Sequence, residues 1–247
     1  MHAIASPEKR TPSNAGKDTT NDASRPGEAM VRARRFDADR HDQVLSLEAA
    51  LEAKVTSRHL LWIDIEGDLD SPDGERMAKR FALDRRTRQA LEEGQDGPFL
   101  SVNGRYLHVR VAAEPNPADS TTAWLDIIAG EDVVITRHDR PLGFLIDYDD
   151  RIEADTALGT LGSVTFLGSL LDDAITSYHA AVDRIEDQVD VLDTRSLRDA
   201  ARGNLLDDLV QLRRRIARLR RLLADHRAVF AALASRDVGE IAADEDG

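Results

Sequence analysis

The sequence predicts an α/β (α+β) fold in which a domain of mixed strands and helices is followed by a long antiparallel helical hairpin. Between residues 31 and 160 the hydrophobic pattern changes repeatedly between that of strands and that of helices. Asn103-Gly104 lies between two short apolar runs and predicts a β-hairpin, hence a partly antiparallel sheet. Two long segments near the C-terminus carry apolar residues at alternating steps of four and three, which is typical of helices that pack against helices.

The first 30 residues have almost no apolar periodicity and are rich in Pro, Ser, Thr, Asn and Asp. Such a segment buries too little apolar surface to offset the entropy of ordering, so we expect residues 1–30 to form a disordered tail. The segment also lacks the apolar core of a signal peptide. The predicted α/β domain therefore covers residues 31–160.

The first half of this domain is predicted to contain one strand and two helices. Residues 59–65 (HLLWIDI) form a short apolar run that ends before Gly67, as expected of a buried strand. Residues 71–73 (Ser-Pro-Asp) are typical of a helix start, and this helix is predicted to reach Phe81. A second helical pattern covers residues 84–92.

The second half is predicted to contain two antiparallel strand pairs and a helix. One pair turns at Asn103-Gly104 and the other at Gly130-Glu131. A glycine-rich joint at residues 159–162 then opens the first long helix. The predicted elements are strands at 99–102, 105–112, 123–129 and 132–136, and a helix at 141–152.

The two long helices predicted within residues 161–238 share one apolar rhythm. In the first, the stripe consists of Leu171, Ile175, Tyr178, Val182, Ile185, Val189 and Leu192. In the second, it consists of Leu205, Leu209, Leu212, Ile216, Leu219, Leu223, His226, Phe230 and Leu233. Residues 166–194 hold seven acids against Arg184, whereas residues 205–236 hold eight arginines against three aspartates. A polar linker with Gly203 joins the two segments, so we predict an antiparallel hairpin of an acidic and a basic helix.

The composition narrows the classes of partner. A net charge of -13 and a pI near 5.0 disfavour nucleic acid, which needs a basic surface, and suit cations better. The arginines of the second helix could suggest RNA or anionic lipid, but neutralisation by the acidic helix explains them more simply. The chain has no cysteine, so a metal would be held by oxygen or imidazole ligands.

The sequence contains no membrane span, and its end is unusual. No apolar run approaches the roughly 18 residues that cross a bilayer, so this chain is expected to be soluble. Residues 239–247 form an acidic end, and neither a proline nor a clear C-cap precedes Gly239. We therefore expect the chain to be cut from a longer protein, before a membrane region.

A series of short motifs follows in order along residues 58–238. In the α/β domain they are Trp62-Ile63-Asp64-Ile65, Phe81-Ala82-Leu83-Asp84, Gln89-Ala90-Leu91, Arg105-Tyr106-Leu107-His108-Val109 and Val133-Val134-Ile135-Thr136-Arg137. The helices add Tyr178, Asp183, Ile185, Glu186, Val189, Asp190 and Leu192, then Leu212-Arg213-Arg214, Leu219-Arg220-Arg221 and Arg227. In this order and spacing the chain resembles the cytoplasmic (N-terminal) domain of the CorA-like divalent metal ion transporters, whose relatives include the zinc transporter ZntB.

This resemblance implies an α/β/α sandwich whose helices lead toward a stalk, two transmembrane helices and a pentameric pore. The Gly-Met-Asn signature of that pore is absent from the sequence. The resemblance thus implies a cytosolic regulatory or assembly domain of a transporter of Mg, Co, Ni or Zn, at the cytoplasmic face of the cell membrane. Such a domain reaches the membrane only through a C-terminal region that this chain lacks. Its partners would be other copies of itself, forming a pentamer in the full-length protein, with this part alone monomeric or weakly associated.

Two other classes of function compete with this one. A soluble coiled-coil scaffold could use the same helices for homodimerisation without any role in transport. An enzyme is poorly supported, because the sequence has no Gly-x-Ser-x-Gly elbow and no glycine-rich loop between a strand and a helix. No tightly bound cofactor is predicted, and a divalent cation such as Mg²⁺ or Zn²⁺ is the expected regulatory ligand.

The resemblance also implies that carboxylates sense divalent cations at the interfaces between neighbouring domains. Asp172 matches a family acid near the start of the first long helix, with Asp173 beside it. Asp237 falls within one residue of another such acid at the stalk. The alternative is that Asp172 and Asp173 complement the positive end of a helix and that Asp237 is merely solvated.

A further pair of candidate metal contacts follows from a mismatch with the family. The family often places a Glu-Asp pair on a short helix after the first strand, and the matching positions here are Gln89-Ala90. Glu92 and Glu93, about one turn later, are the candidate substitutes. The missing pair favours the ZntB-like branch over the Mg²⁺-gated one.

Two other polar features are interpreted as structural. Residues 68–74 resemble a calcium loop, but the sixth position is Asp73 and the twelfth is Lys79, so helix capping is the better account. His226 occupies a seam position between Leu223 and Phe230, where a polar residue sets register or reaches a water. A pH-sensitive or zinc-sensitive contact at His226 stays open as an alternative.

Overall fold

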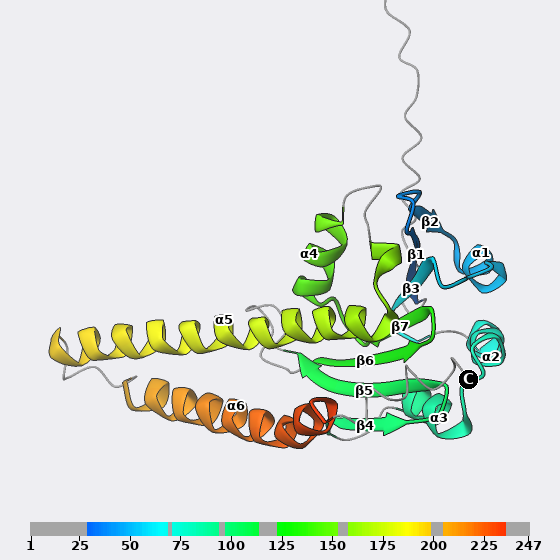
Figure 1. The fold of residues 1–247 in the computed structure, drawn as a ribbon. Coiled ribbons are helices and arrows are strands. Elements are labelled where there is room, and N and C mark those ends of the chain that lie inside the picture. Colours follow the sequence, from blue (N-terminus) through cyan, green and yellow to red (C-terminus); the bar gives the residue numbers. More distant parts are fainter. Residues whose placement is uncertain are drawn as a thin grey trace, which may run out of the picture.

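The computed structural model describes residues 29–68, 71–93, 97–113, 123–152, 158–198 and 205–235. These residues form a mixed sheet with helices on both of its faces (Figure 1). Most of the predicted tail lies outside the described residues. So do the predicted acidic end and the linker that contains Gly203.

The sheet has the mixed, partly antiparallel character that the sequence predicts. Its strands are β1 (Met30–Asp37), β2 (Gln43–Leu45), β3 (His59–Glu66), β4 (Phe99–Val102), β5 (Tyr106–Ala113), β6 (Ala123–Gly130) and β7 (Val133–His138). They are arranged in the order β2-β1-β3-β7-β6-β5-β4. β3 and β7 run parallel, and the other neighbouring pairs are antiparallel. The parallel pair therefore lies in the middle of the sheet.

Helices form a layer on each side of this sheet. They are α1 (Leu47–Glu52), α2 (Ser71–Arg80), α3 (Arg85–Glu93), α4 (Gly143–Arg151), α5 (Ser163–Arg198) and α6 (Leu205–Leu233), with a 3₁₀ helix at Leu158–Thr160. The first three helices share a hydrophobic core with one face of the sheet. α4, the start of α5 and the end of α6 share a core with the other face (Figure 1). The α/β/α sandwich is confirmed.

Alternation along β3 explains why the protein has two cores. Leu61 and Ile63 point into the core beneath α1 to α3, whereas Leu60 and Trp62 point into the core beneath α4 and α5. A strand that is buried on both faces appears in the sequence as a continuous apolar run. This is why residues 59–65 were recognisable as a strand.

The sequence assigned no individual element between residues 31 and 58, and the structure places β1, β2 and α1 there. Three of the eight residues of β1 are arginines, which hide the strand pattern. β1 pairs with β3 along its whole length, so its position depends on a long-range contact. α1 has only six residues, too few to show a helical period.

Local interactions define one predicted turn and the start of one helix. Gly104 follows Asn103 in the turn between β4 and β5 and has a φ of 69°, a conformation that glycine adopts without strain. Asp84 caps α3, because its Oδ1 accepts a hydrogen bond from the backbone N–H of Thr87 at 2.7 Å. The helix itself begins one residue later than predicted, at Arg85.

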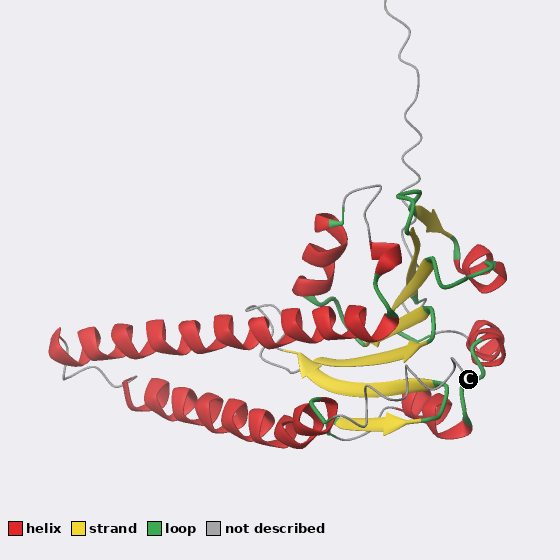
Figure 2. Ribbon diagram, viewed as in Figure 1, coloured by secondary structure: helices red, strands yellow, loops and turns green. Residues whose placement is uncertain are grey.

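α5 and α6 form the predicted antiparallel hairpin and extend well beyond the sheet (Figure 2). α6 has the bounds of its apolar stripe, Leu205 and Leu233. α5 begins at Ser163, eight residues before the stripe, because its first turns pack Phe166, Leu167 and Leu170 onto the sheet. None of the described helices combines the length and the apolar character that crossing a membrane requires.

The hairpin covers only half of its apolar stripe. Buried stripe residues recur at every seventh position, and they are Leu171, Tyr178, Ile185 and Leu192 on α5 and Leu212, Leu219 and His226 on α6. Six other stripe positions are 37–46% exposed, and they are Ile175, Val182 and Val189 on α5 and Leu209, Ile216 and Leu223 on α6. We call these six residues the exposed stripe. The remaining stripe residues, Leu205, Phe230 and Leu233, are partly buried.

Candidate functional site

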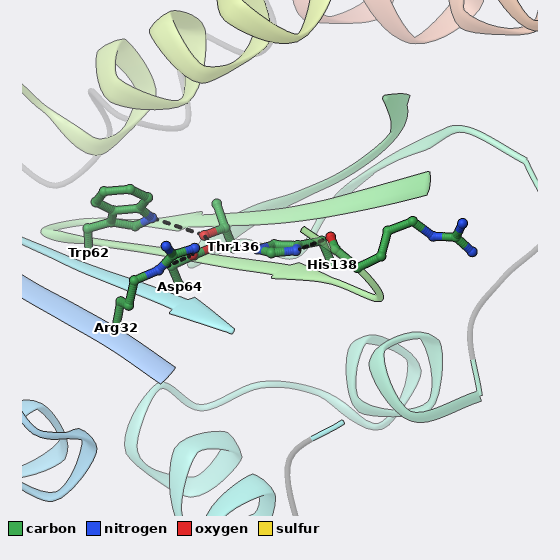
Figure 3. Close-up of polar contacts among 6 residues, drawn as sticks. Arg32, Trp62, Asp64, Thr136 and His138 are labelled. Carbon is green, nitrogen blue, oxygen red and sulfur yellow. Dashed lines mark hydrogen bonds and ion pairs between the residues drawn. The ribbon is translucent and has the colours of Figure 1, made fainter. Parts of the chain in front are cut away.

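Polar side chains gather where the parallel strands β3 and β7 end. Asp64 interrupts the apolar run of β3, and its register partner on β7 is Thr136. His138 lies two residues further along β7 and therefore on the same face of the sheet as Thr136. All three side chains are buried on the face that α4 and α5 cover (Figure 3). A buried polar cluster of this kind is stable only if its members satisfy one another.

Asp64 is the centre of this cluster and is 1% exposed. Its Oδ2 accepts hydrogen bonds from Arg32 on β1, at 2.8 Å from Nη2 and 3.2 Å from Nε. Its Oδ1 accepts a hydrogen bond from the hydroxyl of Thr136 at 2.6 Å. The indole N–H of Trp62 donates to that hydroxyl at 3.0 Å (Figure 3). The carboxylate thus joins three strands, and both of its oxygens are engaged.

His138 completes the cluster with both ring nitrogens. Its Nε2 lies 3.2 Å from Oδ1 of Asp64, and its Nδ1 lies 2.7 Å from the backbone oxygen of Arg140. A carboxylate oxygen and a carbonyl oxygen both accept hydrogen bonds, so both nitrogens must donate. This geometry requires the positively charged imidazolium form of His138.

The pKa values agree with this assignment. Burial raises the pKa of Asp64, but the hydrogen bond and charge of His138, the hydroxyl of Thr136 and the charge of Arg32 lower it overall. Burial lowers the pKa of His138, but the hydrogen bond and charge of Asp64 and the Arg140 carbonyl raise it overall above 6.5. The cluster is therefore a buried ion pair between Asp64 and His138, with Arg32 as a second, partly exposed cation.

A second buried charged group lies on the opposite face of the sheet. Asp126 on β6 accepts hydrogen bonds from Arg110 and from Nε2 of His108, both on β5. The Arg110 guanidinium also lies over the ring of Trp124, at 5.2 Å from its centroid. Asp126, Arg110 and His108 are each at most 4% exposed. This group ties β5 to β6 in the same way that Asp64 ties β3 to β7.

His226 joins the hairpin to the sheet. Its Nε2 accepts a hydrogen bond from the backbone N–H of Ala112 at 2.8 Å, and its Nδ1 donates to the Leu222 carbonyl at 2.6 Å. The hydroxyl of Tyr178 donates to the carbonyl of the same Ala112. Burial lowers the pKa of His226, and the accepting nitrogen requires the neutral form. The structural interpretation of His226 is confirmed, with a backbone group in place of a water.

The candidate metal contacts lie apart within one copy of the chain. Asp172 is exposed and Asp173 is half-buried on α5, which packs on one face of the sheet. Glu92 is exposed near the end of α3, which packs on the other face, and Glu93 is the last residue of that helix. Asp237 lies outside the described residues. Among the described residues, no cluster of three or more His, Cys, Asp or Glu side chains is arranged to hold a metal ion.

The alternative role of Asp172 and Asp173 at the positive end of a helix is wrong. Asp172 was interpreted as a complement to the positive end of a helix, but α5 begins nine residues earlier, at Ser163. The helix dipole acts within the first turn, and Asp172 lies about two and a half turns into the helix. The helix end therefore does not explain the acids at positions 172 and 173.

The buried clusters were not predicted from the sequence as sites. Asp64, Thr136 and His108 belong to short motifs of the sequence, but pairing across strands cannot be read from one strand alone. The signal that could have indicated them is a charged residue inside an otherwise apolar run, as in HLLWIDI and YLHVRV. Because every oxygen of Asp64 is engaged, the cluster suits structural support and not catalysis.

Comparison with known proteins agrees with the fold and the resemblance. A family model described as the CorA-like Mg2+ transporter protein matches residues 57–246. No curated protein sequence matches the chain. The family match covers most of the chain, including the sheet from β3 onward and both long helices.

Several solved structures share the fold at low sequence identity. The full-length CmaX protein has a TM-score of 0.71 at 18% identity, over 91% of this chain and 68% of that one. The complete CorA magnesium transporter from Methanocaldococcus jannaschii has a TM-score of 0.62 at 19% identity, over 83% and 62%. The ZntB cytoplasmic domain from Vibrio parahaemolyticus has a TM-score of 0.59 at 9% identity, over 81% and 80%.

These matches differ in the share of the other protein that this chain covers. It spans 68% of CmaX and 62% of the complete CorA transporter, but 80% of the isolated ZntB cytoplasmic domain. The matched region lacks any described helix that could cross a membrane, and it contains the sandwich and the hairpin. The chain belongs to the CorA-like Mg²⁺ transporter protein family.

Proposed function

We propose that this chain is the cytosolic regulatory and assembly domain of a divalent metal cation transporter, and that it acts by associating with other copies of itself. The observation that carries the proposal is the exposed stripe of the hairpin. It consists of six aliphatic residues at regular spacing, and each keeps more than a third of its surface open to solvent. An apolar row of this length on a charged helix pair suits contact with another protein surface.

The exposed stripe lies on one side of the helix pair. Four residues span one turn of an α-helix plus about 40°. Val182 is therefore rotated by about 40° from Tyr178, toward one flank of the contact between the two helices. Tyr178 contacts His226 across the seam, which places Val182 level with Leu223. α5 and α6 run antiparallel and are related by an approximate two-fold rotation. The same rotation of about 40° therefore places the exposed stripe residues of both helices on the same flank. Six apolar side chains therefore form one continuous surface.

Cations would act on this association through charge. The chain has a net charge of -13, so copies brought together repel one another. Asp172 and Asp173 on α5, Glu92 and Glu93 on α3, and Asp237 are the proposed contacts for Mg²⁺ or Zn²⁺ between copies. A divalent cation held by carboxylates of two copies would reduce the repulsion, and its loss would let the copies shift. In the full-length protein we expect a pentamer at the cytoplasmic face of the membrane.

The assembly part of the proposal is tested by sedimentation velocity at several protein concentrations. Val182→Glu should weaken self-association, because it places a charge in the exposed stripe. Gln188→Glu is the matched control, since it adds the same charge at an exposed position of α5 outside the stripe. Equal self-association of the two variants and the unchanged chain would exclude the stripe as an assembly surface.

The regulatory part is tested by repeating the measurement with added Mg²⁺ or Zn²⁺. We expect the cation to increase self-association or thermal stability, and Asp172→Asn with Asp173→Asn to reduce that response. Glu48→Gln with Glu52→Gln, at two exposed acids of α1, controls for the loss of two charges. If neither cation changed association or stability, the sensing role would fail while the assembly role could still stand.

A further inference from the structure

A pocket opens at the carboxyl ends of the parallel strands β3 and β7, on the face that α2 and α3 cover. It is lined by residues at the ends of both strands and by side chains of the two helices, and its volume is about 100 Å³. An apolar cavity of this order admits a small apolar group, and in sheets with parallel strands ligands bind outside the carboxyl ends. The position is that of a ligand site, and the volume suits one small apolar side chain.

The floor of this pocket is apolar and belongs to the core. It is formed by Ile65 of β3, Met77 and Ala78 of α2, Leu83 before α3 and Leu91 of α3. The first four are at most 7% exposed and pack in one hydrophobic cluster with the sheet. Such a floor is preformed, and it favours an aliphatic group over a polar one.

The rim carries two cations and two anions. Arg137 of β7 donates to the carboxylate of Asp68, so these two charges neutralise each other. Arg88 and Glu92 also line the pocket, and they lie four residues apart on α3. Among the described residues, neither side chain forms an ion pair, with the other or with a third group. The pocket thus presents one unpaired cation and one unpaired anion above an apolar floor.

We propose that this pocket binds a small zwitterion with an apolar side chain, the chemistry of a free aliphatic α-amino acid. The carboxylate of the ligand would accept hydrogen bonds from the Arg88 guanidinium, and its ammonium would donate to the Glu92 carboxylate. The aliphatic side chain would lie on the floor between Ile65 and Leu91. This site is separate from the exposed stripe, so its test does not depend on the self-association of the chain.

The experiment is isothermal titration of the 247-residue chain with L-leucine, in buffer containing EDTA so that no divalent cation occupies Glu92. Two probes remove one charge of leucine each: 4-methylpentanoate lacks the ammonium, and isopentylamine lacks the carboxylate. We expect each probe to bind about tenfold more weakly than L-leucine, or worse, because a charge-assisted hydrogen bond is lost. Equal binding of L-leucine and the two probes would overturn the proposal, as would absence of L-leucine binding.

Substitutions then assign the site. Arg88→Gln should weaken L-leucine binding about tenfold or more while leaving the weak binding of isopentylamine unchanged. Glu92→Gln should do the converse, weakening L-leucine and sparing 4-methylpentanoate. Arg86→Gln, an exposed position on the same helix outside the pocket lining, is the matched control and should bind like the unchanged chain. Leucine affinity that is the same in the Arg88 and Arg86 variants would place binding elsewhere and refute this site.

Discussion

His138 and Asp64 form a buried ion pair across the parallel strands at the centre of the sheet, with 3.2 Å between Nε2 and Oδ1. The pair fixes the ends of β3 and β7 relative to each other. The same imidazole holds the backbone of Arg140 through its other nitrogen, just before the chain enters α4. The ion pair therefore positions the start of the layer on which α5 packs.

Asp64→Asn should strongly destabilise the protein. The substitution removes the charge that compensates His138 and Arg32, and the amide nitrogen of asparagine cannot accept their hydrogen bonds. Removing one partner of a buried ion pair costs about 3 kcal/mol or more in the free energy of unfolding. Urea denaturation measures this. Asp139→Asn, at an exposed carboxylate directly after β7, should cost less than about 1 kcal/mol. Similar losses for the two variants would contradict the role assigned to Asp64.

The ion pair should also make stability depend on pH above 6.5. The pKa of His138 is raised in the folded protein above its ordinary value of 6.5. Its stabilising contribution is therefore fully present below pH 6.5 and is lost as the pH rises through the raised folded-state pKa. We expect the free energy of unfolding to fall over this interval in the unchanged chain, and His138→Gln to remove that part of the dependence. A difference between the two proteins that stayed constant with pH would refute an imidazolium at this position.

His226 should make the free energy of unfolding depend on pH in the opposite direction. Its pKa is lowered in the folded protein, so the unfolded chain takes up a proton first as the pH falls below 6.5. The contribution of neutral His226 is present above pH 6.5 and is lost as the pH falls toward the lowered folded-state pKa. His226→Gln should flatten this acid limb, which chemical denaturation between pH 5 and 7 would reveal. An unchanged acid limb in the variant would contradict a neutral His226. Since the two histidines respond in opposite directions, both contributions coexist near pH 6.5.

The sequence predicted those parts of the fold whose signals are local. Asn103-Gly104 and the heptad rhythm of α6 act through neighbouring residues, and the structure has a turn and a helix at those positions. β1 was missed because its arginines hide the strand pattern, and Arg32 is paired to Asp64 more than thirty residues away. The buried clusters were missed because their members come from different strands.

The hairpin shows what periodicity can and cannot tell. The alternating steps of four and three predicted one apolar seam on each helix. In the structure a two-helix pair covers one position of each heptad and leaves the other exposed, because each helix has a single neighbour in the hairpin. The burial of a stripe position depends on the number of neighbouring helices, which the stripe itself does not encode.

Leucine substitutions on α6 should separate the two rows of the stripe. Leu219 is 9% exposed and packs in the hairpin core, whereas Leu223, four residues later on the same helix, is 44% exposed. Leu219→Ala should lower the free energy of unfolding by about 2 to 3 kcal/mol, because it removes a buried side chain and leaves a cavity. Leu223→Ala should cost less than about 1 kcal/mol, since much of its side chain already contacts water. Both substitutions remove the same side chain from the same helix, so the difference between the two losses of unfolding free energy reports burial alone. Urea denaturation at low protein concentration measures the two free energies of unfolding for the isolated chain.

The two leucines should also differ in their effect on self-association. At concentrations where copies associate, Leu223→Ala should reduce self-association, whereas Leu219→Ala should have no specific effect on it. Equal losses of stability at low concentration would mean that the seam is covered on both sides in solution, and the exposed stripe would then be unavailable to a partner.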